Sequence, residues 1–328
     1  MSKKIICLAL SALLFALSVS AQAQQAGKIP RIGYLAASSL SGQSARIEAF
    51  RQGLRELGYV EGKNIVIEYR SAEGKLDRLP ALAAELVRLK VDIIVTGGPI
   101  PTRVAKGATS TIPIVMTQDV DPVGTGLVAS LARPGGNITG LSTLAPELSG
   151  KQLELLKETI PKLSRVAVFG TSTRAGNAQA LEEIELAAKA FGVKLQYLDV
   201  LGPKDIETAF RAASKGRADA VLMMVAGGIA NSLRTQIADL AVKSRLPAIY
   251  DRSEFVDDGG LMSYGVNRSD LARRAATYVD KIMKGRTPAD LPVEQPMRFE
   301  FVINLNAAKQ IGLTIPPNVL VRANRVIR

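Results

Sequence analysis

The amino-acid sequence contains the same pattern twice, and this internal repeat restricts the possible folds more than any other feature. Each copy alternates short β-branched apolar runs with longer amphipathic segments, a pattern typical of strand–helix units that build a parallel sheet. The first copy begins with a strand at Arg31, and the second begins 134 residues later at Arg165. Two copies of one topology predict two similar lobes.

Four predicted strands correspond between the copies. In the first copy they begin near Arg31, Asn64, Asp92 and Ile112, and in the second near Arg165, Lys194, Asp219 and Leu246. In both copies the third strand runs into a Gly-Gly loop. The predicted fold class is therefore α/β, with two doubly wound parallel-sheet lobes.

One further unit is available to each lobe after the second copy. The sequence predicts a strand at 261–266, a helix at 269–284, an extended linker at 288–296, and a strand at 299–303 followed by a helix from Asn306. If the first unit returns to lobe one and the last belongs to lobe two, the chain crosses near Thr139, Tyr264 and Pro292. Lobe one then comprises 28–139 plus 265–292, lobe two comprises 140–264 plus 293–328, and the crossings form a three-stranded hinge.

The loops at the carboxyl ends of the strands are the expected binding surface, because open parallel sheets bind their ligands there. These loops are rich in Gly, Ser and Thr in both copies, as at 36–42 and 170–176. Glycine admits a close approach of the backbone, hydroxyls bond to ligands, and the following helix offers free N–H groups. Each residue can instead cap a helix or turn the chain, so the expectation rests on the recurring set.

The N-terminal segment has the features of an export signal. Lys3 and Lys4 precede an apolar run over 5–19, and Ala21-Gln22-Ala23 is a small-x-small cleavage signal. We therefore expect residues 1–23 to be removed and the mature chain to be periplasmic. Cys7 lies early in the apolar run and not at the cleavage site, which favours release over lipid anchoring.

Composition excludes several kinds of site. The sequence has no histidine and its one cysteine lies in the predicted signal, which excludes Ser-His-Asp and Cys-His catalysis and His- or Cys-based zinc sites. A match to the dinucleotide fingerprint at Gly124, Gly126 and Ala129 follows no predicted strand, so we expect no cofactor. The net charge of +12 is spread without a basic run, which favours a solvated surface over nucleic-acid binding.

Several longer motifs carry a family resemblance. They are Asp121-Pro-Val-Gly-Thr-Gly-Leu127, Arg133-Pro-Gly-Gly-Asn-Ile-Thr-Gly-Leu141, Gly259-Gly-Leu-Met-Ser-Tyr-Gly265, Leu291-Pro-Val-Glu-Gln-Pro296 and Gly312-Leu-Thr-Ile-Pro-Pro317. Together they resemble the ABC transporter substrate-binding protein family that includes the tryptophan-binding-like proteins, over nearly the whole mature chain. The resemblance implies the type I periplasmic-binding-protein fold, an ABC permease and an ATPase as partners, and no catalysis.

The candidate ligand-binding residues match the family's pocket segments by position or lie on the neighbouring strand ends. They are Ser38, Ser39, Thr96, Gly97, Gly98 and Asp121 in lobe one, and Thr171, Ser172, Gly227, Tyr250, Asp251 and Tyr264 in lobe two. The acidic Asp251 and the Gly-Gly pair at 227–228 make this pocket more acidic and less aromatic than the resemblance implies. The identity of the ligand is therefore not fixed by the resemblance.

Individual roles have alternatives. Asp121 can accept a hydrogen bond from a ligand ammonium, or it can cap a helix whose first position is Pro122. The two tyrosines, Tyr250 and Tyr264, can stack on a ring or donate a hydrogen bond, or they can pack half-buried. Asp251 can contact the ligand or cap its loop.

The prediction for function is an extracytoplasmic solute-binding protein of an ABC importer, acting as a monomer and closing two lobes around a small polar or amino-acid-like ligand. An exported ligand-sensing subunit for a receptor is the first alternative, and an enzyme on the same scaffold is a second. A ligand-responsive repressor core shares the architecture, but the export signal and the lack of an N-terminal DNA-binding helix pair count against it.

Overall fold

The structure is a computed structural model of the chain and describes residues 29–143, 145–174, 176–225, 227–296 and 298–328. The predicted export signal at 1–23 lies outside the described residues. Within the described ranges, no helix is long and apolar enough to cross a membrane.

Two sheets carry the internal repeat, and their first five strands have the same order. The first sheet contains β1 (Arg31–Ala36), β2 (Val66–Ser71), β3 (Ile93–Thr96), β4 (Ile114–Met116) and β5 (Ile138–Gly140) in the order β2-β1-β3-β4-β5. The second contains β6 (Arg165–Gly170), β7 (Lys194–Asp199), β8 (Ala220–Met223), β9 (Ala248–Tyr250) and β10 (Met262–Val266) in the order β7-β6-β8-β9-β10. All pairs within each set are parallel. The predicted fold class is confirmed.

The second sheet departs from a purely parallel arrangement at one edge. β11 (Phe299–Asn304) is antiparallel to β10, and β12 (Arg325–Ile327) pairs with β11. Phe299 at the start of β11 lies opposite Val266 at the end of β10. Because the chain enters β11 beside the carboxyl end of β10, β11 has to run in the opposite direction.

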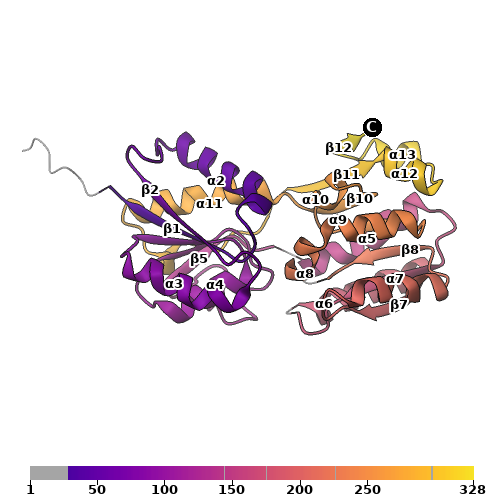
Figure 1. Cartoon of the computed structure of the whole chain (residues 1–328), viewed down its shortest axis with the longest axis horizontal. Helices are drawn as coiled ribbons and strands as arrows, with labels where there is room; N and C mark the ends of the chain where they lie inside the picture. The colour runs from indigo at the N-terminus through magenta and orange to yellow at the C-terminus, as the bar shows by residue number, and fades with distance from the viewer. Residues whose placement is uncertain (1–28, 144, 175, 226, 297) are drawn as a thin grey trace, which may run out of the picture. The chain divides into compact units, whose positions relative to one another are not determined.

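Helices cover both faces of each sheet. In lobe one they are α2 (Ser44–Glu56), α3 (Leu79–Arg88), α4 (Pro99–Ala108) and α11 (Arg268–Met283), and in lobe two they are α5 (Ala145–Thr159), α6 (Asn177–Phe191), α7 (Asp205–Lys215), α8 (Gly227–Ser232), α9 (Arg234–Lys243), α10 (Glu254–Asp257), α12 (Leu305–Ile311) and α13 (Pro317–Leu320). Alternate residues of one strand point to opposite faces. In the first sheet, α2 and α11 lie on one face, and α3 and α4 lie on the other (Figure 1). Tyr34 of β1 accordingly packs with residues of α2 and α11, whereas its neighbour Leu35 packs with residues of α3 and α4.

An aspartate holds the amino end of the first strand in each copy. Asp92 accepts a hydrogen bond from the Arg31 N–H at 2.8 Å, and Asp219 accepts one from the Arg165 N–H at 2.8 Å. In both copies the aspartate N–H bonds back to the arginine carbonyl. The repeat is thus preserved at the level of individual hydrogen bonds.

The helix that follows the fifth strand packs in the other lobe in both copies. α5 follows β5 of the first sheet but packs against α6, and α11 follows β10 of the second sheet but packs against α2. The connections are tied together, because the Thr139 hydroxyl donates to the Leu291 carbonyl at 2.7 Å and Leu141 forms a β-bridge with Glu294. Two of the three expected crossing points, near Thr139 and Pro292, therefore lie side by side.

Gly53 allows α11 to approach α2 closely. A Cβ atom at this buried position would lie 2.3 Å from the Arg273 carbonyl oxygen and 2.9 Å from the Ala276 Cβ. We expect Gly53→Ala to lower the free energy of unfolding by about 1–3 kcal/mol, because the added methyl group forces the helices apart. Urea denaturation measures this change.

Gly107 is the matched control, because it lies in α4 and has no atom within 4 Å of an added Cβ. Gly107→Ala should stabilise the protein by about 0.5–1 kcal/mol through helix propensity alone. Equal effects of the two substitutions would contradict the close packing of α2 and α11.

Candidate functional site

Buried polar atoms without a hydrogen-bond partner gather at the carboxyl ends of the strands. Among the described residues, seven buried side-chain atoms lack a partner, and five of them end or follow β1, β4, β6 and β9. These five are Gln43 Oε1, Asp119 Oδ2, Arg174 Nε, Asn177 Oδ1 and Tyr250 OH. The other two, Gln196 Oε1 and Ser263 Oγ, lie within strands. Since buried polar groups are normally bonded, this distribution indicates a polar ligand at the strand ends.

In lobe one, a buried glutamine presents its carbonyl oxygen. Gln43 Nε2 donates to the Ser38 hydroxyl at 2.8 Å and to the Ser38 carbonyl at 3.2 Å, which fixes the amide. Its Oε1 lies beside Gly97, where a Cβ would come within 2.9 Å. Two of the predicted residues, Ser38 and Gly97, therefore both lie next to the side-chain amide of Gln43.

The other predicted residues in the loops after β1 and β3 form hydrogen bonds within the protein. The Ser39 hydroxyl accepts from the Gly42 N–H at 3.2 Å, which holds the loop after β1. Thr96 is buried and shares a 2.7 Å hydrogen bond with Thr102, and the Gly98 carbonyl accepts from Thr102 at the start of α4. These residues shape the loops in the present structure.

Two aspartates follow β4, and they differ in their bonding. Asp121, the predicted one, caps a turn: its Oδ1 accepts from the Gly124 N–H at 2.8 Å, and its carbonyl accepts from Thr125. Asp119, which the sequence analysis did not single out, is only 1% exposed; its Oδ1 accepts from the Asp121 N–H at 3.1 Å and its Oδ2 has no partner. Burial raises the pKa of Asp119 to about 6, although the Asp121 N–H and the Arg103 guanidinium oppose the rise.

In lobe two, the loop after β6 contains both predicted and unpredicted residues. The Thr171 hydroxyl donates to the Val200 carbonyl at 2.8 Å, and the Ser172 hydroxyl donates to Asp199 at 2.6 Å. These bonds hold a loop from which Arg174 and Asn177 present unbonded atoms. Burial lowers the pKa of Arg174 more than the nearby Asp251 carboxylate raises it.

Asp251, at the end of β9, lies between two guanidinium groups. It binds Arg252 through both oxygens at 2.7 and 3.0 Å and Arg268 at 3.1 Å, and Arg252 also donates to Asn231 at 2.5 Å. Burial opposes ionisation of Asp251, but the Arg252 and Arg268 charges outweigh it and hold its pKa at about 2. Burial and the charge of Arg252 together lower the pKa of Arg268 to about 10. The predicted Asp251 therefore organises an arginine cluster.

The predicted tyrosines both have ring partners. Tyr250 is fully buried and stacks on Phe255 with the ring centroids 4.4 Å apart, so only its unbonded hydroxyl is available. The Tyr264 ring packs against the rings of Phe299 and Phe301, with the ring centroids 6.0 and 6.3 Å apart. The remaining predicted residue, at position 227, is the first of α8.

The structure therefore brings the predicted residues to the carboxyl edges of their own sheets, except Tyr264, which lies in the middle of β10. Their role as ligand contacts stays a prediction. The residues that the sequence analysis missed are Gln43, Asp119, Arg174, Asn177, Arg252 and Arg268. A signal was available for Asp119, Arg252 and Arg268, because each is a charged residue within a few positions of a predicted strand end. Gln43 and Asn177 lie farther along the chain, at the start of the following helical segment. The prediction favoured the Ser and Thr residues of the strand-end loops because hydroxyls can bind ligands. In the structure, these hydroxyls form hydrogen bonds within the loops.

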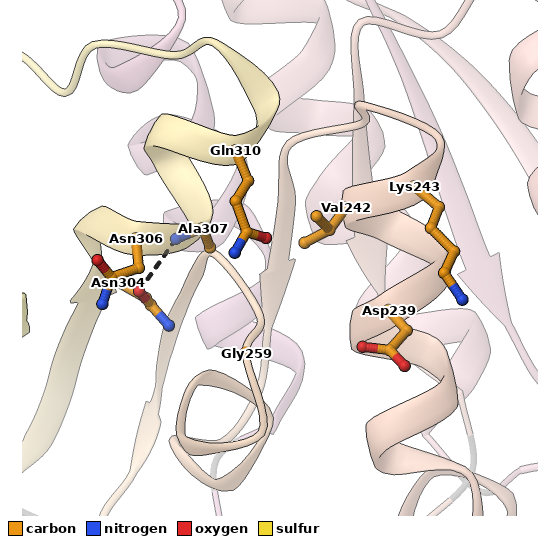
Figure 2. Close-up of a pocket in the computed structure, with 8 residues that line it drawn as sticks. All are labelled: Asp239, Val242, Lys243, Gly259, Asn304, Asn306, Ala307 and Gln310. Carbon is orange, nitrogen blue, oxygen red and sulfur yellow. Dashed lines mark hydrogen bonds between the residues drawn. The ribbon is translucent and has the colours of Figure 1, made fainter.

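A cavity of about 340 Å³ in lobe two lies at the opposite edge of the sheet (Figure 2). Gly259 precedes β10 and Asn304 ends the antiparallel β11, so both line the amino edge of the parallel strands. Asn304 is already engaged, because its Oδ1 accepts from the Ala307 N–H at 3.1 Å. No group of three or more His, Cys, Asp or Glu side chains in the described ranges could hold a metal ion.

Asp119 should make the stability of the protein depend on pH. Its folded-state pKa of about 6 lies above the ordinary value of 3.8, so the folded protein holds this proton more tightly than the unfolded chain. The contribution of Asp119 is then greatest below about pH 4 and falls by about 3 kcal/mol as the pH rises through 6. We expect Asp119→Asn to remove this fall, which urea denaturation between about pH 4 and 7 measures.

Asp251 supplies the contrasting case, because its depressed pKa gives a contribution that is complete above the ordinary pKa and is lost only as the pH falls toward 2. Asp251→Asn should therefore leave the pH profile between 5 and 7 unchanged in shape. Parallel profiles for the wild-type protein and D119N would rule out the buried titration of Asp119.

Comparisons with known proteins agree with this architecture. Residues 35–327 match the model of the family described as "ABC transporter substrate binding protein". A tyrosine-binding protein of Clostridioides difficile is 26% identical over 266 residues, which is 81% of this chain and 76% of that protein. A solved conserved domain protein of Vibrio cholerae is 30% identical with a TM-score of 0.82, covering 91% of this chain and all of the other.

A further solved structure, an ABC domain from Streptococcus pneumoniae in complex with L-Trp, is 26% identical. Its TM-score is 0.83, and the match covers 92% of this chain and all of the other. The family model spans most of the chain, and the repeated sheets and strand-end loops are those expected from the motifs. The chain belongs to the ABC transporter substrate-binding protein family.

Proposed function

We propose that this protein is the extracytoplasmic solute-binding component of an ABC importer and that it encloses a small polar, amino-acid-like ligand between its two lobes. The observation that carries the proposal is the set of unbonded buried polar atoms at the strand ends of both lobes. A ligand that bonds to atoms of both lobes favours the closed arrangement over the open one. Its binding energy is then coupled to closure.

The connections between the lobes support a hinge. Three segments, near Thr139, Tyr264 and Pro292, join the sheets, and hydrogen bonds tie the first to the third. Several short parallel connections permit closure while they restrict other relative motions. We take lobe one as 28–139 plus 265–292 and lobe two as 140–264 plus 293–328.

The partners follow from the family and from the N-terminal segment. Removal of residues 1–23 after export would place the mature chain in the periplasm, where a membrane-bound ABC permease and its ATPase receive the closed form. Relatives described by their ligands are a tyrosine-binding protein and a domain bound to L-Trp, which supports an amino-acid-like ligand and a binding role without catalysis.

Substitution of one amide with an unbonded oxygen in each lobe tests capture by both lobes. Gln43→Ala and Asn177→Ala should each weaken binding of the ligand that co-purifies with the protein by about tenfold, because each removes an oxygen whose hydrogen bond is made only in the complex. The internal bonds of Gln43 to Ser38 and of Asn177 to Tyr197 are lost as well. Mass spectrometry identifies the ligand, and calorimetry measures its affinity. Gln52→Ala in α2 and Gln179→Ala in α6 are the controls, because both side chains are exposed.

An unchanged affinity in either amide variant would remove that lobe from the site. Covalent change of the bound compound during incubation would overturn the binding-protein proposal in favour of an enzyme.

A further inference from the structure

Two arginines at the strand ends have no carboxylate bound to them. Arg174 follows β6 and Arg46 lies in the first turn of α2 after β1, and neither makes an ion pair or a side-chain hydrogen bond within the described part of the chain. Both side chains are half-buried, and the Nε of Arg174 is fully buried without a hydrogen-bond partner. Burial is also the main cause that lowers the pKa of each. A buried charge without a partner is costly, so a ligand with anionic groups would relieve the cost at both positions.

One of the two nearby carboxylates is bound by other arginines, and the other forms no ion pair in the described residues. Asp251 is bound by Arg252 and Arg268. Burial of Glu254 raises its pKa, but the charges of Arg268, Arg252 and Arg46 outweigh burial and lower it. Glu254 also raises the pKa of Arg46, but burial of Arg46 outweighs this effect. These loops therefore contain four guanidinium groups and two carboxylates, which leaves room for two negative charges from a ligand.

One further carboxylate is available in lobe one for a cation. Asp119 is buried after β4 with its Oδ2 unbonded, and the charged groups acting on it are Arg103 and Asp121. A ligand ammonium would form a charge-assisted hydrogen bond with this oxygen. Among the described strand-end residues, Arg46 and Arg174 are thus half-buried guanidinium groups without an ion pair, and Asp119 is a buried carboxylate without one. Arg103 is exposed, and Asp121 and Asp199 accept hydrogen bonds from their own loops.

The tyrosine rings on these strands already pack against other groups of the protein. Tyr250 stacks on Phe255, and the Tyr197 ring fills the space where Gly170 would carry a side chain. Tyr264 packs on Phe299 and Phe301, and the whole sequence contains no tryptophan. Tyr197 and Tyr264 are half-buried, and each ring already packs against other protein groups, so neither of them is wholly free to stack on an aromatic ligand.

We infer that the ligand is a small acidic amino acid, with its two carboxylates bound by Arg46 and Arg174 and its ammonium bound by Asp119. This inference rests on the proposed function, because it assumes that the strand ends of both lobes meet one ligand. It assigns a substrate class that differs from the aromatic ligands named for the relatives. The charge balance follows directly, since two carboxylates and one ammonium match two guanidinium groups and one carboxylate.

Calorimetry on the protein freed of co-purifying ligand tests the class. The probes are L-glutamate, L-aspartate, succinate, L-alanine, L-tyrosine and L-tryptophan. We expect L-glutamate or L-aspartate to bind at least about tenfold more tightly than L-alanine, L-tyrosine or L-tryptophan, because one charge-assisted contact accounts for about that factor. This ranking uses the wild-type protein, so it stays informative even if a variant fails to fold.

Three variants assign the contacts. Arg46→Gln and Arg174→Gln should each weaken binding of the better acidic amino acid by about 10- to 100-fold. Asp119→Asn should weaken its binding but leave succinate, which has no ammonium, within about twofold. Arg55→Gln in α2 and Arg211→Gln in α7 are the matched controls, because their side chains are 51% and 70% exposed.

The outcomes separate the two proposals. If L-tyrosine or L-tryptophan binds at least as tightly as the acidic amino acids, the acidic class is overturned and the solute-binding function stands. If neither acidic amino acid binds while another small molecule co-purifies, the acidic class again fails alone. If no small molecule binds or co-purifies, both proposals fail.

Discussion

Parallel strand pairing is the constraint on which the rest of this structure depends. It places the carboxyl end of each of the first five strands of a sheet at one edge, so loops that are far apart in the sequence meet there. The helices on both faces cover the apolar side chains of the strands, which favours the loops at the carboxyl ends as the binding surface. Because the chain repeats this arrangement, it has two such edges.

Exchange of helices between the lobes joins the two sheets into one protein. α5 and α11 each leave the sheet whose fifth strand they follow and complete the helical layer of the other. Gly53 permits the close contact of α11 with α2, and Thr139 ties the first connection to the third. Neither lobe is therefore built from one continuous stretch of chain, which allows several connections to act together.

Much of the fold could be predicted from local patterns. Strand starts at Arg31 and Arg165, the Gly-Gly loop at 97–98 and the later strand at 299–303 all follow from apolar runs and breakers, which depend on neighbours in the sequence. The Gly-Gly pair at 227–228 was predicted as a loop, but it begins α8. The antiparallel direction of β11 was not predicted, because direction is set by where the chain enters the sheet. The candidate site was harder for a similar reason: Ser39, Thr96, Thr171 and Ser172 have the right chemistry, but their hydroxyls are used by neighbouring groups.

The sequence by itself determined the repeated α/β topology, the lack of imidazole and of any cysteine after Cys7, and the family motifs, because these depend only on residue types and their order. Only the tertiary structure decided which polar atoms remain unbonded. Asp121 and Asp119 lie two residues apart, yet one caps a turn and the other is buried with a free oxygen. Arg252 and Arg174 differ in the same way, since only Arg252 has a carboxylate within bonding distance. Hydrogen bonds are satisfied by groups that approach in space, and no local pattern specifies that approach.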